Sequence, residues 1–329
     1  QYFKKSILVV YSANCVYLPG SSWIYAHRLL WESGEEGAAV ILSLKNISVK
    51  FASGHNVQAV KDVSLDIEEK SKVAIVGETG SGKSILLLAI LRLLPENAIV
   101  SGQAFFTMKG SPAGVVDLMT LKRKELDHIR GACISYIPQG SGNGMNPLYN
   151  VGFQVAEPMV THQGISKKQG FSKAVELMRR FKMGNEERIA KQYPHTYSGG
   201  MRQRALIAMG IGAGAQVLLA DEPTKGLDER RIALVVESFR LLTDKTIVCV
   251  THDLNFANAI SDHICVMYAA SQVEYAPTKE LMEHPLHPYT QDMLAAMPEN
   301  GLHFCGGFAM SHEDYEDAGC KYEIGRAHV

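Results

Sequence analysis

The sequence predicts an α/β protein with a central parallel sheet, and three short apolar runs lead to that prediction. Residues 73–76 form a continuous apolar run of the fully buried type, and residues 215–224 and 245–253 contain two more. The first run is followed at once by a glycine-rich loop, whereas the other two end in acidic or imidazole side chains. Such runs are typical of central parallel strands whose carboxyl ends carry the chemistry of the protein.

Further strands and helices are expected around these runs. Residues 40–51 and 57–67 alternate apolar and polar side chains, which predicts half-buried antiparallel strands. A helix is expected over residues 84–94, stopped by the proline that follows. Helical patterning over residues 166–183 and 201–215 indicates a helical subdomain inserted between the glycine loop and the later strands.

The composition is that of an ordinary globular protein. The chain has 329 residues, 46% hydrophobic and 20% charged, with a formal net charge of -1 at pH 7. A charge so close to zero gives no electrostatic argument for binding nucleic acid or an anionic membrane surface. No run reaches the roughly 18 apolar residues of a membrane span, so the chain is not expected to cross a bilayer by itself. The six cysteines lack paired or metal-type spacing, which favours a reducing, cytosolic compartment.

The glycine loop reads GETGSGKS and fits the pattern G-x-x-x-x-G-K-[ST]. Its glycines allow backbone angles that turn successive N–H groups toward phosphate oxygens, and the helix that follows adds its positive end. Lys83 is expected to reach the β and γ phosphates, and the Ser84 hydroxyl to ligate Mg²⁺. An incidental Gly/Ser loop is the alternative, but the flanking strand and helix argue against it. A nucleoside triphosphate is therefore expected to contact Gly77, Glu78, Thr79, Gly80, Ser81, Gly82, Lys83 and Ser84.

Two acidic residues and a histidine at the later strand ends are candidates for hydrolysis. Asp221 is placed to hold Mg²⁺, directly or through water, and Glu222 beside it is placed to polarise an attacking water. A simple helix cap is the other interpretation of this acidic pair, and the glycine loop favours catalysis. His252 is either a satisfied core imidazole or a donor to the transferring phosphoryl group.

A second anion-binding element lies in YSGGMRQR, residues 197–204. Two glycines after Ser198, at the start of a helix, make an N-terminus that suits an anion. One nucleotide does not need both phosphate-binding elements in the same chain, so this one is surplus in a single copy.

Together these motifs resemble the ATP-binding cassette of an ABC transporter over roughly residues 42–276. Gln139 stands in the place of the family's Q-loop, and Asp228 in that of its D-loop, which belongs to the nucleotide site. The resemblance implies a P-loop NTPase fold with a RecA-like core, an antiparallel β subdomain and a helical subdomain, and ATP and Mg²⁺ as cofactors. It also implies that two cassettes pair head to tail, each closing its signature residues over the ATP of the other. These signature residues are Ser198, Gly199 and Gly200.

The resemblance assigns further roles. It implies that Gln139 senses the γ-phosphate and joins Ser84 and Asp221 as a Mg²⁺ ligand, and that Gln139 acts with Glu222 and His252 in catalysis. An aromatic residue shortly after the first strand stacks on adenine in this family. Phe51 is the nearest candidate here, with a core phenylalanine as an equal alternative.

Some positions depart from the family pattern. Tyr197 and Met201 replace commoner residues of the signature, and Lys225-Gly226 replaces the small residues usual before the D-loop leucine. None of these changes removes a phosphate-contacting or catalytic group, so a competent ATPase is expected.

The segments outside these motifs indicate one branch of the family. Residues 284–298 resemble the segment that follows the cassette in ATPase subunits of oligopeptide, dipeptide and nickel importers, although a generic proline-capped helix is the alternative. The expected domains are an N-terminal extension of unclear role (1–38), the cassette (39–276, helical subdomain about 140–215) and a C-terminal extension of the peptide/nickel importer type (277–329). An iron–sulfur site cannot be carried over to residues 319–327, because the later cysteines of the family pattern are missing.

The expected function is that of an ATPase subunit bound peripherally to the cytoplasmic face of the inner membrane, where it drives import of peptides, nickel or metal chelates. Its expected partners are a second cassette, identical or paralogous, two membrane permease subunits and, indirectly, an extracytoplasmic solute-binding protein; no nucleic acid is expected. The alternatives are a soluble ABC ATPase of translation or DNA repair, and a purely regulatory nucleotide-binding module.

The segment after Gln139, residues 140–155, is a candidate surface for the membrane subunits. Leu148, Tyr149, Val151 and Phe153 are expected to receive a short cytoplasmic helix of a permease, with internal packing as the alternative.

Overall fold

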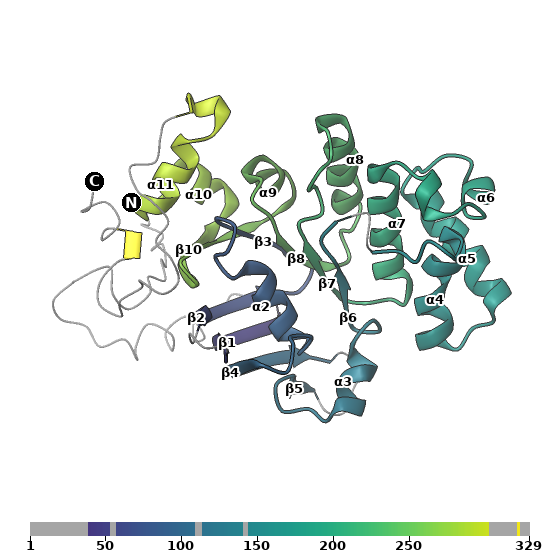
Figure 1. The fold of residues 1–329 in the computed structure, drawn as a ribbon, viewed down its shortest axis with the longest axis horizontal. Helices are drawn as coiled ribbons and strands as arrows, with labels where there is room; N and C mark the ends of the chain where they lie inside the picture. Colours follow the sequence, from purple (N-terminus) through teal and green to yellow (C-terminus); the bar gives the residue numbers. More distant parts are fainter. Residues whose placement is uncertain (1–38, 53–56, 109–113, 141–143, 303–320, 323–329) are drawn as a thin grey trace, which may run out of the picture.

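The computed structural model describes residues 39–52, 57–108, 114–140, 144–302 and 321–322 (Figure 1). Within these residues, ten strands form one mixed sheet in the order β5-β4-β1-β2-β10-β9-β3-β8-β7-β6. The predicted α/β class is confirmed. The first half of the sheet comprises β5 (Val115–Asp117), β4 (Ala98–Thr107), β1 (Val40–Phe51) and β2 (Val57–Glu68). The second half comprises β10 (Ser271–Pro277), β9 (His263–Tyr268), β3 (Lys72–Val76), β8 (Thr246–Val250), β7 (Val217–Asp221) and β6 (Ile134–Ile137).

The second half of the sheet is a parallel core. β3 pairs in parallel with β9 on one side and β8 on the other, and β7 continues the parallel order from β8 to β6. Every residue of β7 and β8 is buried, which explains why these segments read as unbroken apolar runs. Because the carboxyl ends of β3, β7 and β8 share one edge, the segments that follow them in the chain meet there.

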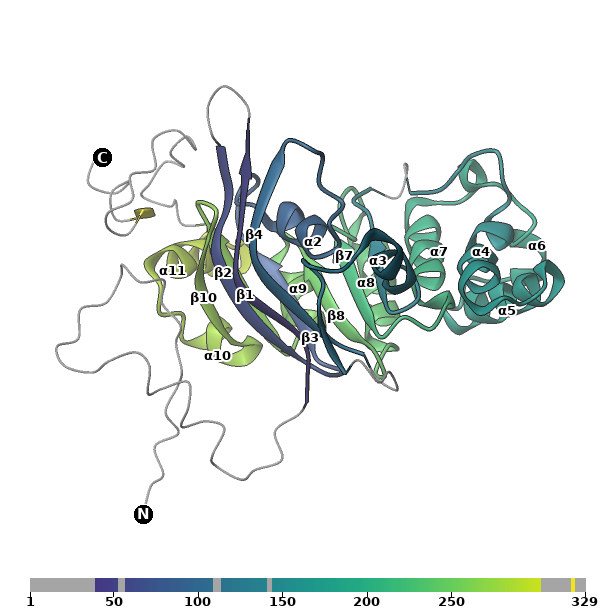
Figure 2. The same ribbon diagram turned by 90° about the horizontal axis from the view of Figure 1, so that it is seen from below.

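The first half of the sheet is antiparallel. β1 pairs with β2 and with β4, and buried residues alternate with more exposed ones along both β1 and β2, as predicted from residues 40–51 and 57–67. The two halves join where Ser271 pairs with Lys61, whose N–H donates to the carbonyl of Ala270 at 2.7 Å. α2 (Lys83–Ile90) contacts β1, β2 and β7, and therefore lies between the halves (Figure 2).

α2 is shorter than predicted. It ends at Ile90 rather than at residue 94, and Leu93 is exposed. Arg92 adopts a left-handed φ of +51°. The N–H of Leu93 donates to the carbonyl of Leu88, and that of Arg92 to the carbonyl of Ala89, both at 2.9 Å. These two bonds close a Schellman motif, which ends the helix before the proline is reached.

A lobe of helices lies beyond β6 and β7 (Figure 1). We call α4, α5, α6 and α7 the helical lobe. Their bounds are α4 (Val151–Gln163), α5 (Lys167–Arg180), α6 (Glu186–Ile189) and α7 (Gly199–Gly212), with the short helix η1 (Pro194–Thr196) before α7. α5 begins with a capping box between Ser166 and Gln169, and α7 begins at Gly199 because the Ser198 hydroxyl accepts the N–H of Met201.

The remaining helices flank the sheet. α10 and α11 lie beside β10 at the opposite end of the molecule from the helical lobe (Figure 1). The bounds are α3 (Arg123–Ile129), α8 (Glu229–Arg240), α9 (Leu254–Ile260), α10 (Thr278–Glu283), α11 (Pro288–Ala295) and η2 (Pro298–Asn300). In the part of the chain that the structure describes, none of the helices has the length and apolar character that a membrane span requires.

Candidate functional site

The glycine loop is held between two strands that leave no room for side chains. Gly77 follows β3 directly with φ +148°, and a Cβ there would come 2.0 Å from the carbonyl oxygen of Met267 in β9. Gly82 has φ +94°, and its Cβ would come 2.1 Å from the carbonyl oxygen of Ala59 in β2. Glycine is therefore required at both positions, by space as well as by backbone angle.

Lys83 is buried inside this loop, with 5% of its surface exposed. Its ammonium donates to the carbonyl oxygens of Gly77 at 2.8 Å and Glu78 at 2.6 Å, and to the hydroxyl of Ser81 at 3.3 Å. Burial lowers the pKa of Lys83, and the carboxylates of Glu222, Asp221 and Glu78 act in the opposite direction. A partly desolvated cation in a loop of backbone groups is suited to phosphate oxygens.

Asp221 joins the glycine loop to the neighbouring strands. It ends β7, is 3% exposed, and accepts hydrogen bonds from the Ser84 hydroxyl at 2.8 Å and the Tyr136 hydroxyl at 3.1 Å. Burial raises the pKa of Asp221, and these two hydrogen bonds oppose the shift. Ser84 and Asp221, predicted to act on one metal ion, are therefore side by side.

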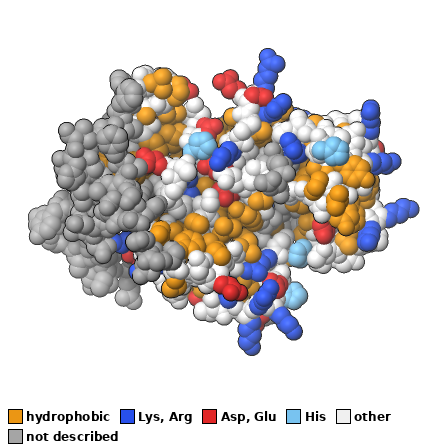
Figure 3. All heavy atoms as spheres, in the orientation of Figure 1, with side chains coloured by type: hydrophobic (Ala, Val, Ile, Leu, Met, Phe, Trp, Pro, Cys, Tyr) orange, Lys and Arg blue, Asp and Glu red, His pale blue; other side chains and the backbone are white. Residues whose placement is uncertain are grey.

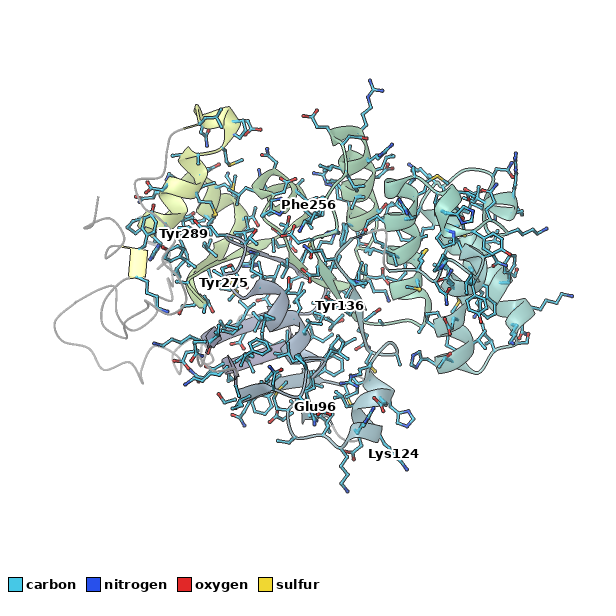
Figure 4. The ribbon with its side chains drawn as sticks, in the orientation of Figure 1. Glu96, Lys124, Tyr136, Phe256, Tyr275 and Tyr289 are labelled. Atoms are coloured by element: carbon cyan, nitrogen blue, oxygen red, sulfur yellow. The ribbon has the colours of Figure 1, made fainter. Side chains whose placement is uncertain are left out.

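Tyr136 was missed by the sequence analysis. Tyr136 (Figure 4) lies in β6, next to β7, and this position explains how its hydroxyl reaches Asp221. The only signal in the sequence was the phenolic hydroxyl of a tyrosine in the short run ISYI, three residues before Gln139.

Glu222 and His252 are in direct contact. His252 Nδ1 lies 2.8 Å from Glu222 Oε2, and the Glu222 side chain is largely buried whereas that of His252 is half exposed. Glu222 adopts a left-handed φ of +46°, and its N–H donates to the carbonyl of Val250 at 2.8 Å. That conformation costs about 1–3 kcal/mol for a residue with a Cβ, a strain that is typical of functional sites. The predicted pairing of the β7 and β8 ends thus brings the acid and the imidazole together.

No hydrogen bond within the described residues links Gln139 or Phe51 to this cluster. Gln139 follows β6 by two residues and its side chain is exposed. Phe51 ends β1, where it is half buried and packs against the main apolar core. Both the adenine-stacking and the core interpretations of Phe51 agree with that position, so its role stays a prediction.

The signature residues form a second cluster with the D-loop. Ser198 caps α7, and a Cβ at Gly200 would lie 3.3 Å from the Cβ of Arg231. Arg231 in turn forms an ion pair of 3.1 Å with Asp228, which caps α8. Among the described residues, no hydrogen bond links Ser198, Gly199 or Gly200 to the glycine loop.

The candidate coupling segment is only partly on the surface, and residues 141–143 lie outside the described part. Leu148 and Tyr149 are 79% and 53% exposed, and the rings of Tyr149 and Phe153 lie tilted against each other with centroids 5.4 Å apart. The expectation for Val151 as a surface residue is wrong: at the start of α4 its side chain is fully buried in an apolar core cluster. Figure 3 shows apolar side chains gathered over the helical lobe on one face.

Comparison with known families gives two matches. A family model described as ABC transporter matches residues 60–225. A second, described as oligopeptide/dipeptide transporter, C-terminal region, matches residues 273–324.

Relatives with similar sequences have names from peptide transport. A putative peptide import ATP-binding protein of Brucella melitensis is 37% identical over 265 residues, which span 79% of this chain and 78% of that protein. The oligopeptide transport ATP-binding protein OppD of Bacillus subtilis is 37% identical over 264 residues, spanning 78% of this chain and 72% of that protein. The dipeptide transport ATP-binding protein DppD of the same organism is 37% identical over 268 residues, spanning 80% and 78%.

Solved structures give the same likeness in three dimensions. The ATP-binding cassette MJ0796, solved as a dimer in a post-hydrolysis state with ADP and phosphate bound, superposes with a TM-score of 0.62 at 27% identity. The match covers 72% of this chain and 99% of that chain.

Proposed function

The chain belongs to the ABC transporter family, in the branch of peptide importers, and from that premise we propose how its residues perform the reaction. The chain is an ATPase that energises an ABC importer. The observation that carries the proposed site is the convergence of three segments at one edge of the parallel sheet. There the loop cation Lys83 lies in the electrostatic field of Glu222 and Asp221, and Asp221 is bonded to Ser84.

The glycine loop is the proposed phosphate site. Its backbone N–H groups and the start of α2 surround the phosphate oxygens, and the Lys83 ammonium neutralises charge on the β and γ groups. Binding ATP requires Lys83 to exchange some of its bonds to Gly77 and Glu78 for bonds to phosphate oxygens. The cation is already desolvated, so this exchange costs little further dehydration.

The Ser84 and Asp221 pair fits a magnesium site. The Ser84 Oγ and Asp221 Oδ1 atoms are 2.8 Å apart, and hydroxyl and carboxylate oxygens are the donors that Mg²⁺ prefers. The ion, when bound, neutralises phosphate charge. Tyr136 holds the second carboxylate oxygen and so fixes the orientation of Asp221. Gln139 is proposed as a further ligand, which its exposed side chain would reach through movement of its loop.

Glu222 is the proposed residue that orients the attacking water. A carboxylate only accepts hydrogen bonds, so the proton between the pair belongs to His252 Nδ1. Glu222 thereby fixes the orientation of the imidazole, and Nε2 can donate to the transferring phosphoryl group when the ring carries a proton on that nitrogen as well. His252 in turn fixes one oxygen of Glu222 and leaves the other to polarise water.

Pairing with a second cassette completes the proposed site. The chain carries Ser198, Gly199 and Gly200 in a cluster without hydrogen bonds to its own glycine loop, as far as the described residues go, and the similar cassette MJ0796 was solved as a dimer. We propose that the signature of a second copy or a paralogue closes over the ATP, and that Asp228 lies at that junction.

The rest of the proposed assembly follows from the importer family. The chain would act at the cytoplasmic face of the inner membrane with two permease subunits, and a solute-binding protein would deliver the solute. Peptides are the proposed solute class, because the relatives described above are named for peptide, oligopeptide and dipeptide import. A role in translation or DNA repair is not favoured, since residues 273–324 match the C-terminal region of peptide transporters.

Uptake by the purified complex tests this function. Vesicles that contain the full chain, its partner cassette and two permeases should accumulate a labelled oligopeptide with ATP, and Lys83→Ala should abolish uptake. Lys124→Ala, at an exposed lysine of α3, is the matched control and should transport normally. Peptide uptake that survives Lys83→Ala in every copy of the chain would contradict the proposal.

A further inference from the structure

A tyrosine of the C-terminal region reaches the glycine loop. The hydroxyl oxygen of Tyr289, in α11, accepts the backbone N–H of Glu78 at 3.0 Å, across 211 residues of sequence. Tyr289 is 4% exposed, whereas Glu78 lies on the surface of the loop. This hydrogen bond directly connects the phosphate-binding loop to the segment matched by the peptide-transporter C-terminal model.

The tripeptide His287-Pro288-Tyr289 is built to hold that tyrosine in place. His287 caps α11, where its Nδ1 accepts the N–H of Tyr289 at 3.1 Å, and Pro288 occupies the first helical position. The buried carboxylate of Glu274, in β10, accepts the N–H groups of Leu286 and His287 at 2.9 and 3.1 Å. The start of α11 is therefore anchored to the sheet, and the Tyr289 backbone cannot shift independently of it.

Aromatic packing fixes the ring of Tyr289 as well. Its centroid lies 4.4 Å from that of Tyr268 and 5.4 Å from that of Tyr322. Tyr268 follows Met267, the residue whose carbonyl confines Gly77. Strand, tyrosine ring and glycine loop thus form one packed unit, so the hydroxyl meets the loop in a defined place.

The same peptide group binds Tyr289 on one side and Lys83 on the other. The Gly77 carbonyl, which accepts the Lys83 ammonium at 2.8 Å, and the Glu78 N–H, which donates to Tyr289, belong to one peptide bond. A trans peptide is planar, with its C=O and N–H directed oppositely. Holding the N–H therefore holds the carbonyl that orients the lysine.

We propose that Tyr289 is a positioning residue for the nucleotide site: it clamps the Gly77–Glu78 peptide and so places Lys83 for the phosphates. This inference rests on the proposed role of the glycine loop in binding ATP. The C-terminal region then contributes to nucleotide affinity without touching the nucleotide, and any displacement of α11 changes that affinity.

Tyr289→Phe tests the clamp, because it deletes the hydroxyl and keeps the ring. The dissociation constant of a non-hydrolysable ATP analogue, with magnesium present, should rise about 2–10-fold, the range expected for one hydrogen bond. The kcat at saturating ATP should change less than about twofold, since Tyr289 acts through the loop. Amide hydrogen exchange at Glu78 should also accelerate, because its hydroxyl acceptor is gone.

Tyr322→Phe is the matched control. The Tyr322 hydroxyl bonds to Asp292, so the control removes a hydroxyl from the same aromatic cluster without altering the loop. It should leave nucleotide affinity and exchange at Glu78 unchanged even if it lowers the melting temperature. Equal effects of the two variants, or tighter binding by Tyr289→Phe, would overturn the clamp.

Lys83→Ala in the same binding assay distinguishes a failure of the clamp from a failure of the proposed phosphate site. If Lys83→Ala loses affinity and Tyr289→Phe does not, the nucleotide site stands and the clamp is wrong. If Lys83→Ala also binds normally, the proposed phosphate site itself fails.

Discussion

The imidazole of His252 lies 2.8 Å from the carboxylate of Glu222, so the ends of two adjacent parallel strands are joined by side chains as well as by the sheet. Each member of the pair restricts the other. Glu222 selects the tautomer of His252, and His252 occupies one of the two oxygens of Glu222. Separate substitutions can distinguish the two roles.

Glu222→Gln should retain ATP binding and lose hydrolysis by a factor of about 10²–10⁴, the usual loss for a general base. The amide preserves the shape and a bond to His252 but cannot accept a proton from water. Single-turnover hydrolysis and nucleotide binding should be measured together. Glu229→Gln, at an exposed position of α8, is the control. Hydrolysis at the parental rate in Glu222→Gln would transfer the catalytic role to another residue.

His252→Ala should reduce hydrolysis by about 10–100-fold and change ATP affinity little. The loss should be smaller than for Glu222→Gln, because the carboxylate remains and only its positioning is disturbed. His128→Ala, on an exposed face of α3, should have no effect. Unaltered turnover in His252→Ala would show that this residue has only a structural role.

Asp221→Asn should stabilise the nucleotide-free protein while abolishing ATPase activity. Burial raises the pKa of Asp221, so above that pKa the ionised group lowers the free energy of unfolding, and the penalty disappears as the pH falls through it. The variant should gain about 0.5–2 kcal/mol at pH 8, because a neutral amide avoids the cost of burying the charge. The gain should shrink at acidic pH.

Urea unfolding at several pH values, without nucleotide, measures the effect of Asp221→Asn. Asp228→Asn serves as the control, because Asn caps α8 about as well as Asp. A variant that is less stable than the parent at pH 8 would contradict the interpretation of the Asp221 environment.

Complementation tests the paired site if the chain can pair with itself. Lys83→Ala and Gly200→Asp should each be inactive, and a mixture should regain up to about one quarter of parental activity, since half of randomly formed dimers are mixed and each of those has one intact composite site. Asp at 200 places a carboxylate where phosphate is expected. Gly200→Ala crowds Arg231 equally, without the charge, and should keep more activity. Mixtures that remain inactive, while the parent gains specific activity on concentration, would mean that the signature acts elsewhere.

Tyr149→Glu should leave ATPase activity and thermal stability of the isolated chain intact and prevent assembly with the permeases. Tyr149 is 53% exposed, so a charge there costs the folded chain little and a hydrophobic interface much. Val151→Glu is the opposite case and should unfold the helical lobe, because Val151 is fully buried. Normal assembly and uptake with Tyr149→Glu would place the docking surface elsewhere.

The parts of the site that the sequence could predict are those attached to strand ends. Asp221 and His252 follow apolar runs, and the strand order needed to bring them together is the common parallel one. Tyr136 could not be predicted, because its partner depends on β6 being next to β7. Tyr289 could not be predicted either, since its hydroxyl meets Glu78 only after α11 packs on the sheet. The early end of α2 depends on Arg92, a residue type that rarely takes a left-handed φ.

The central position of β3 has a consequence during synthesis. Its neighbours β8 and β9 are translated long after it: the N–H of Lys72 bonds to Asp262, 190 residues later. At about 5–20 residues per second the ribosome needs roughly 10–40 s to deliver them. Until then β3, which leads into the glycine loop, has neither of its neighbouring strands, and we expect that the emerging chain does not bind or hydrolyse ATP at this site. A messenger RNA broken before the codons of β8 is therefore expected to yield a fragment without ATPase activity, rather than an ATPase uncoupled from transport.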